Sequence, residues 1–254
     1  MAVQVLESDF PNDRLPLLRW LMFTGVCAFG FVLTWYYGLF HLMIASDKTY
    51  ISLIIVVLYL ATCVHCFVRT LTISRELDTA HRVAALVSRG VDGYSVAGQN
   101  VMTTDGTRLP AGEVTNHIRN LILKSRLQGH HRIDQTLLLR GLADTLRGPN
   151  QLGSFASDAL LKLGLLGTII GFILMLAPIA GLDAADRASV KSSMGLMSDG
   201  MAVAMYTTLA GLVGSILVRI QYYLLDAATQ RVFSDAVTLT ETRVTPALER
   251  RHDG

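Results

Sequence analysis

Two segments decide the fold: residues 163–172, LGLLGTIIGF, and residues 200–212, GMAVAMYTTLAGL. Neither contains Asp, Glu, Lys, Arg or His, and they belong to apolar runs over residues 163–182 and 201–218. Each run is close to the roughly 20 residues that a helix needs to cross the hydrocarbon core of a bilayer. Because only helices and closed barrels satisfy their backbone in lipid, such continuous runs predict transmembrane helices.

Each of these two predicted spans carries a narrow face of small and hydroxyl residues. In a helix, Gly164, Thr168, Gly171, Met175 and Pro178 share one face, and Ala204, Thr208, Gly211 and Ser215 share another. One interpretation is close helix packing, with the threonines bonded to their own helix. The other is a polar pore face, with hydroxyls near the bilayer midplane, where an unpaired polar group is costly. The spacing leaves both open.

Two further apolar runs, residues 20–40 and 50–68, raise the expected number of spans to four. The first run is longer than the apolar core of a signal peptide and has no small-residue cleavage site, so we expect it to be retained. Of the 254 residues, 51% are hydrophobic and only 17% are charged, which argues against a typical soluble enzyme. A net charge of +2 gives no indication of nucleic-acid binding, and three cysteines predict no disulfide framework.

The remaining chain is too polar to cross a membrane. We expect helices over residues 74–90, 113–128, 133–146 and 219–245, the first continuing from the second span. The predicted fold is therefore an all-α, polytopic membrane protein with four transmembrane helices and a helical cytosolic domain. Its expected parts are a cytosolic N-terminal segment (1–19), transmembrane helices 1 and 2 (20–68), the cytosolic helical domain (69–157), a channel region with transmembrane helices 3 and 4 (158–226) and a cytosolic C-terminal helix (227–254).

Positive charge predicts the orientation of the spans. If the four spans alternate, one side of the membrane receives Arg14, Arg19, Arg69, Arg75, Arg82, Arg147, Lys162 and Arg219. The opposite side receives two short loops with few basic residues. Since cytoplasmic segments are enriched in Lys and Arg, both termini and residues 69–157 should be cytosolic.

Candidate sites outside the small-residue faces are few. Asp199 precedes the fourth apolar run, where it would either cap the helix N-terminus or attract cations to a pore mouth. Cys63, His65 and Cys66 lack further ligands at zinc spacing, so we expect no metal site, and His65 should be a polar residue near the inner interface. No nucleophile, base and orienting group can be assembled, and no phosphate-binding loop is present. The sequence therefore predicts neither an enzyme nor a cofactor.

The segment GLLGTIIGF, followed about 30 residues later by GMAVAMYTTLAGL, resembles the ion-channel region of the MotA/TolQ/ExbB proton channel family. The resemblance is strongest over residues 155–226. Four spans with a large cytosolic block between the second and third resemble the MotA/PomA branch.

This resemblance implies a homopentamer in the bacterial inner membrane, a ring around two copies of a one-span, MotB/TolR/ExbD-like partner that supplies an essential aspartate. The family's pore-lining threonines correspond to Thr168 and Thr208, with Thr207 beside them. The expected function is an ion-conducting, stator-like subunit that uses the proton motive force. The alternatives are a sodium-driven channel of the same family and a non-conducting structural scaffold. Independently, spans three and four contain no acidic, basic or histidine residue, so a proton path would need a partner's titratable group.

Overall fold

The computed structural model describes residues 15–38, 40–41, 43, 49–88, 94–98, 100–103, 106–128, 134–181 and 187–250. Most of the expected N-terminal segment therefore lies outside the described residues. The main helices are α1 (Leu15–Tyr36), α3 (Ile51–Ser88), α4 (Glu113–Leu127), α5 (Thr136–Arg147), α6 (Gln151–Leu176) and α7 (Arg187–Leu239). Short helical segments complete the list: η1 (Gly148–Asn150), η2 (Ala177–Gly181), η3 (Thr240–Val244) and α8 (Thr245–Arg250).

Three helical segments among the described residues are long and apolar enough to cross a membrane: Ile51–Ser88, Thr136–Ile179 and Ser189–Glu249. They contain the second, third and fourth predicted spans. The first predicted span corresponds to α1, whose apolar part, Trp20–Tyr36, is shorter than the length that defines these three. The assignment of residues 20–40 as a membrane span thus stays a prediction.

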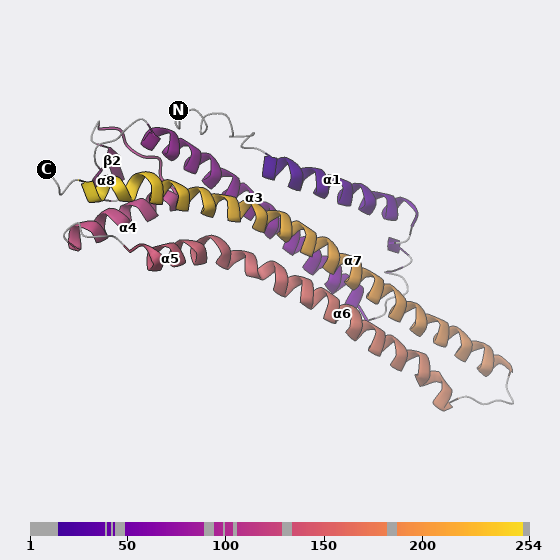
Figure 1. Ribbon diagram of the computed structural model, residues 1–254. Coiled ribbons are helices and arrows are strands. Elements are labelled where there is room, and N and C mark those ends of the chain that lie inside the picture. Colours follow the sequence, from indigo (N-terminus) through magenta and orange to yellow (C-terminus); the bar gives the residue numbers. More distant parts are fainter. Residues whose placement is uncertain are drawn as a thin grey trace. The chain divides into compact units, whose positions relative to one another are not determined.

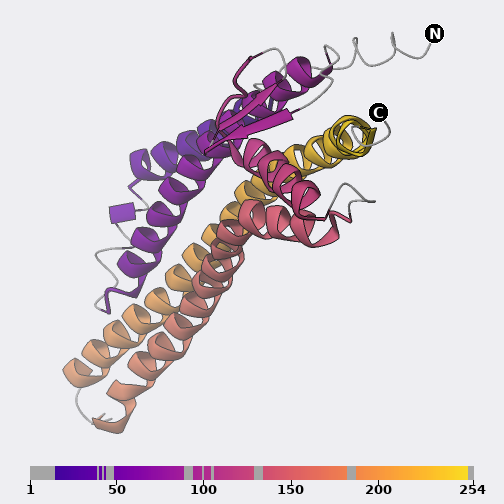
Figure 2. The ribbon, with the colours of Figure 1, turned by 90° about the vertical axis from the view of Figure 1, so that its left-hand side faces the viewer.

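The chain forms two compact units. The first, called the apolar unit here, consists of Trp20–Val68 and Gln151–Tyr223. Within it α6 and α7 run side by side, as both views show (Figures 1 and 2). The second, called the polar unit, includes Arg69–Asn150 and the chain from Leu224 onward. Because α3 and α7 are each continuous across a boundary, both helices contribute to both units.

The polar unit has a core of large aliphatic side chains. Val83 on α3, Ile118 and Leu121 on α4, and Val232 on α7 are fully buried. These residues recur at helical spacing on otherwise polar helices, which is the pattern that water imposes on a packed helix. Two strands, β1 (Tyr94–Ala97) and β2 (Asn100–Thr103), form an antiparallel hairpin against α4 (Figure 2).

Side chains from α3 complete the ends of two other helices in the polar unit. The backbone N–H of Glu113, at the start of α4, donates to Oε2 of Glu76 over 3.0 Å. The preceding residue, Gly112, has no side chain to serve as a cap, and a Cβ there would lie 2.8 Å from Thr79. At the end of α5, the guanidinium of Arg69 donates to the carbonyl of Leu146 over 3.2 Å. Both contacts satisfy backbone groups that a helix end leaves open.

The structure differs from three sequence-based expectations. The hairpin was not predicted, because its strands have four residues each and the sequence between residues 92 and 110 shows only turn signals. The third apolar run does not stay α-helical to residue 182, because α6 ends at Leu176 and Pro178 lies in the 3₁₀ segment η2. The cap predicted for Asp199 is wrong, since α7 begins at Arg187, three turns earlier.

Candidate functional site: the interface of α6 and α7

Glycines bring α6 and α7 into direct backbone contact. A Cβ on Gly171 would lie 2.6 Å from the backbone nitrogen of Ala204, and a Cβ on Gly164 would lie 3.2 Å from the Cα of Gly211. From the other side, a Cβ on Gly211 would lie 2.7 Å from the carbonyl oxygen of Leu160. Five of the residues predicted for the two faces are small ones, and four of these five, Gly164, Gly171, Ala204 and Gly211, meet between the two helices. Close approach through small residues is how membrane helices associate.

The fifth predicted residue of this face, Ser215, joins a hydroxyl pair. The Oγ atoms of Ser157 on α6 and Ser215 on α7 are 2.9 Å apart, and the Ser157 hydroxyl also lies 3.1 Å from the carbonyl oxygen of Ser215. Both side chains are buried. The pair satisfies two polar groups that would otherwise be costly in a low-dielectric interface.

The two adjacent threonines of α7 have different surroundings. Thr207 is fully buried and fills the space opposite Gly167, where a Cβ would lie 2.2 Å from its Oγ1. Its hydroxyl bonds to the carbonyls of Val203 and Ala204 in its own helix. Thr208 is half-buried, and its hydroxyl donates to the carbonyl of Ala204 over 2.9 Å and lies 3.4 Å from the carbonyl of Gly164. The burial of Thr207 favours the packing interpretation for that residue.

Thr168 on α6 is half-buried, like Thr208. Its hydroxyl donates to the carbonyl of Leu165 in the same helix. A threonine that donates its proton to the backbone still has oxygen lone pairs to offer. Thr168 and Thr208 can therefore accept hydrogen bonds from water or from a protonated carboxyl group, or coordinate a cation, without losing their bonds to α6 and α7.

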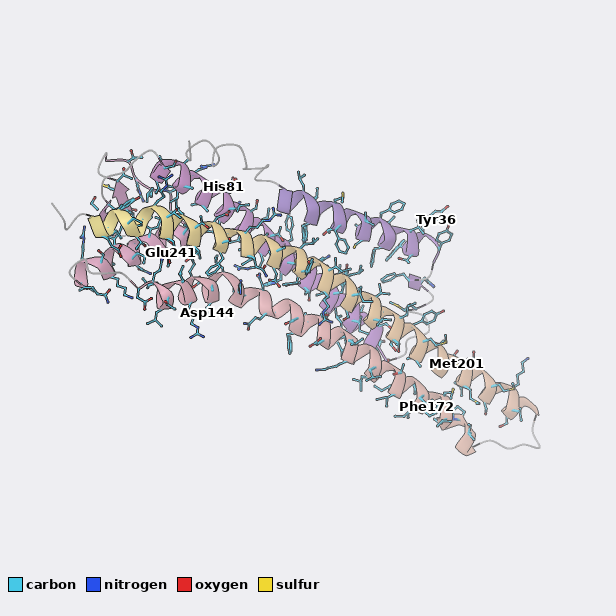
Figure 3. The ribbon with its side chains drawn as sticks, viewed as in Figure 1. Tyr36, His81, Asp144, Phe172, Met201 and Glu241 are labelled. Carbon is cyan, nitrogen blue, oxygen red and sulfur yellow. The ribbon has the colours of Figure 1, made fainter. Side chains whose placement is uncertain are left out.

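Large apolar side chains cover the outer faces of both helices. Phe172 on α6 and Met201 on α7, labelled in Figure 3, are both more than half exposed. Leu165, Met205 and Leu209 are exposed by 60% or more. In water such a surface would aggregate, so these faces must contact lipid or other protein chains.

Asp199 is exposed on α7, one residue before the buried Gly200. Because α7 begins at Arg187, Asp199 lies inside the helix and does not cap it. It lies near the end of the α6–α7 pair. Helices α6 and α7 are also in close contact at this height, because a Cβ on Gly200 would lie 2.5 Å from the backbone nitrogen of Met175. No cluster of metal ligands occurs among the residues described.

The sequence missed one polar group in the apolar unit. Cys63 and His65 on α3 meet Gln221 and Tyr222 on α7: the Cys63 thiol donates to Oε1 of Gln221 over 3.5 Å, and His65 bonds to the Tyr222 hydroxyl over 2.7 Å. Gln221 is fully buried. The available signal was a histidine inside a span, but only the structure supplies its partner.

Comparison with protein families gives one match. The sequence model of the MotA/TolQ/ExbB proton channel family matches residues 121–236, which include all of α6 and nearly all of α7. The match does not distinguish the MotA/PomA branch from the others. No curated protein and no solved structure matches the chain.

The family match and the structure agree on the class of protein. The matched region contains both members of the glycine-packed helix pair and both half-buried threonines. Three membrane-length apolar helices fit a multi-pass, mainly helical membrane protein. Residues 121–236, slightly less than half of the chain, are thus similar to the MotA/TolQ/ExbB proton channel family.

Proposed function

We propose that this chain is the ion-conducting, stator-like subunit of a MotA/TolQ/ExbB-type motor driven by the proton motive force. The observation that carries the proposal is the contrast between Thr207 and Thr208. Thr207 is fully buried between α6 and α7, whereas Thr208 is half-buried on a helix pair whose outer faces carry large apolar side chains. The half-buried threonines Thr168 on α6 and Thr208 on α7 suit a narrow polar path.

A partner supplies the titratable group in this proposal. The apolar parts of α6 and α7 contain no acidic or basic residue and no histidine, so their threonines can solvate a proton carrier but cannot be one. Proteins of this family work in oligomers with one-span partners. We propose a homopentamer around two partner helices, each with an essential aspartate that Thr168 and Thr208 contact.

The same proposal sets the topology. Both termini and residues 69–157 lie in the cytosol of a bacterial cell, and the chain spans the inner membrane four times, with α1 as the first span. Asp199 lies toward the opposite side, where it attracts cations to the pore mouth. Single cysteines at the exposed positions Leu127 and Lys191 test this: an impermeant thiol reagent added to intact cells should label position 191 only.

Replacing Thr208 tests the proposed role directly. Thr208→Val keeps the shape and removes the hydroxyl, which leaves a carboxylate or water with one partner fewer at a cost of about 1–3 kcal/mol, or roughly 5- to 150-fold in flux. The ion flux of the reconstituted complex should fall by that factor, while its assembly, checked by native mass spectrometry, survives. Thr208→Ser should retain most of the flux.

Thr207→Val is the matched control. Since the Thr207 hydroxyl bonds only to its own helix, this variant should conduct nearly as well as the unchanged protein. If Thr208→Val conducts normally but fails to assemble, the scaffold alternative is favoured. The burial of Thr207 also supports protons over sodium, because the Thr207–Thr208 pair does not present two hydroxyls to one path.

A further inference from the structure

A hydrogen-bonded pair of rings joins α3 to α7 inside the apolar unit. Nδ1 of His65 and the hydroxyl oxygen of Tyr222 are 2.7 Å apart. The two rings are stacked, with 6.3 Å between their centroids and 13° between their planes. Tyr222 is 4% exposed, and His65 is half-buried. The function proposed above gives neither residue a role.

Helix α6 supplies the third side of this site. A Cβ on Gly153 would lie 2.1 Å from the ring of Tyr222, so the ring occupies the space that a side chain at residue 153 would need. Tyr222 is thereby held between His65 on one side and the backbone of α6 on the other. The orientation of the hydroxyl toward His65 is fixed by three helices.

His65 is the one residue among Asp, Glu, Lys, Arg and His in the apolar run 50–68. An ionisable group inside a span is costly and is normally paired, and it commonly marks an ion path. His65 lies three residues from the end of this run, on the side where α3 continues to Arg69. A histidine is also the side chain whose ordinary titration falls nearest neutral pH.

Hydroxyl side chains recur along one face of α7, from Thr208 to Tyr222. Thr208, Ser215 and Tyr222 are spaced by seven residues, so they lie on the same face of the helix. Each step is about 10 Å along the axis, which requires water between the side chains for a proton to pass. We propose that His65, held by Tyr222, is a proton acceptor at the cytosolic end of the ion path; this inference rests on the proposed function.

The proposed proton transfer to and from His65 needs no reactant other than water. In the neutral tautomer that carries its proton on Nδ1, this N–H donates to the Tyr222 oxygen and Nε2 keeps its lone pair. A proton from a hydronium ion binds Nε2, which gives an imidazolium and a water molecule. Release of that proton to cytosolic water restores the neutral ring. The bond between Nδ1 and Tyr222 survives both steps, so the ring stays oriented throughout the cycle.

The charged neighbours along each helix are few. On α3, Arg69 follows His65 by one turn and donates to the carbonyl of Leu146. On α7, Arg219 precedes Tyr222 by one turn and is exposed, and Asp226 follows by one turn and accepts from Asn150. On α6, Asp158 is exposed. The hydrogen-bond partner of His65 is the hydroxyl of Tyr222.

The test measures proton flux against cytosolic-side pH in vesicles that hold this chain and its one-span partner. The proton flux of the unchanged complex should depend on the cytosolic-side pH as a single sigmoid. His65→Gln, a polar side chain that does not titrate, should remove the sigmoid and lower the flux by about 100-fold, the lower end of what a positioned proton acceptor contributes. Tyr222→Phe should keep the sigmoid and shift its midpoint. His81→Gln, on the same helix outside the apolar run, is the control and should leave the profile unchanged.

A His65→Gln complex with the original flux and pH profile would overturn this inference. If that variant does not assemble, Tyr222→Phe decides, because it keeps the imidazole and the ring; an unshifted midpoint then counts against the proposal. A complex that conducts no protons even when unchanged would contradict the proposed function itself. The two failures are therefore distinguishable.

Discussion

The apolar and polar units bury opposite kinds of side chain. At the centre of the α6–α7 interface lie glycine, alanine, serine and threonine, while Leu165 and Met205 are more than 60% exposed. In the polar unit Ile118 and Leu121 are fully buried, and charged side chains cover the outside. Small residues inside and large apolar residues outside are favourable only where the solvent is itself apolar. The difference indicates lipid or neighbouring chains around the first unit and water around the second.

The largest expected effect is a difference in stability between two variants, each with one aliphatic side chain truncated. Ile118→Ala removes a fully buried side chain from the core of the polar unit and should lower the free energy of unfolding by about 2–5 kcal/mol. Leu165→Ala removes a side chain that is 62% exposed on α6. In lipid this truncation removes few contacts within the protein, so the denaturation midpoint of the reconstituted protein should barely move. Equal losses in the two variants would show that the exposed face of α6 is a packed protein interface and not a lipid-facing surface.

The next largest effect is a difference in stability between alanine variants of two glycines of the apolar unit. Gly171→Ala places a Cβ 2.6 Å from the backbone of Ala204, so the helices must separate, at a cost of about 1–3 kcal/mol. Gly195→Ala on α7 meets nothing within 4 Å and should be neutral or stabilise by up to about 1 kcal/mol through helix propensity. Thermal unfolding in detergent measures both. Equal unfolding temperatures of the two variants would contradict the close approach of α6 and α7 at Gly171.

The smallest effect is a pH dependence confined to the polar unit. Burial lowers the pKa of His117 on α4 below its ordinary value of 6.5. The folded state therefore binds a proton less readily than the unfolded state, and stability present above pH 6.5 is lost as the pH falls through the lower, folded-state value.

Hydrogen exchange of α4 amides between pH 7 and pH 5 should detect this loss, and His117→Gln should reduce it. Burial acts in the opposite sense on Glu76, whose pKa it raises, so the stability contribution of Glu76 is present at low pH and is lost as the pH rises through its folded-state pKa. An unchanged slope in His117→Gln would mean that the acid sensitivity of α4 has another source.

The sequence predicted the features that depend on hydrophobic period and length. Apolar runs predicted the spans contained in α3, α6 and α7, and the helix expected over residues 113–128 matches α4 (Glu113–Leu127) almost to the residue. The resemblance carried by residues 163–172 and 200–212 is confirmed by the family match. These signals are local, so they can be read without knowing which helix faces which.

What the sequence could not predict depends on contacts between distant residues. Thr207 and Thr208 are adjacent, and only the register of α7 on α6 shows that Gly167 takes up the first and leaves the second partly exposed. The hydrogen bonds from Glu113 to Glu76 and between His65 and Tyr222 likewise join separate helices. The capping role considered for Asp199 was wrong because residues 187–199 are too polar to be recognised as part of the span. In the structure they are helical, and α7 begins twelve residues before Asp199.

Proton flux through the reconstituted complex tests the central claim most directly. Vesicles that hold this chain with its one-span partner should carry protons down an imposed proton gradient at a fixed sodium concentration. Vesicles with this chain alone should carry none, because the apolar parts of α6 and α7 contain no Asp, Glu, Lys, Arg or His. Replacing the partner's aspartate by asparagine should abolish the flux. Flux that follows a sodium gradient at fixed pH, or that persists without the partner, would contradict the account.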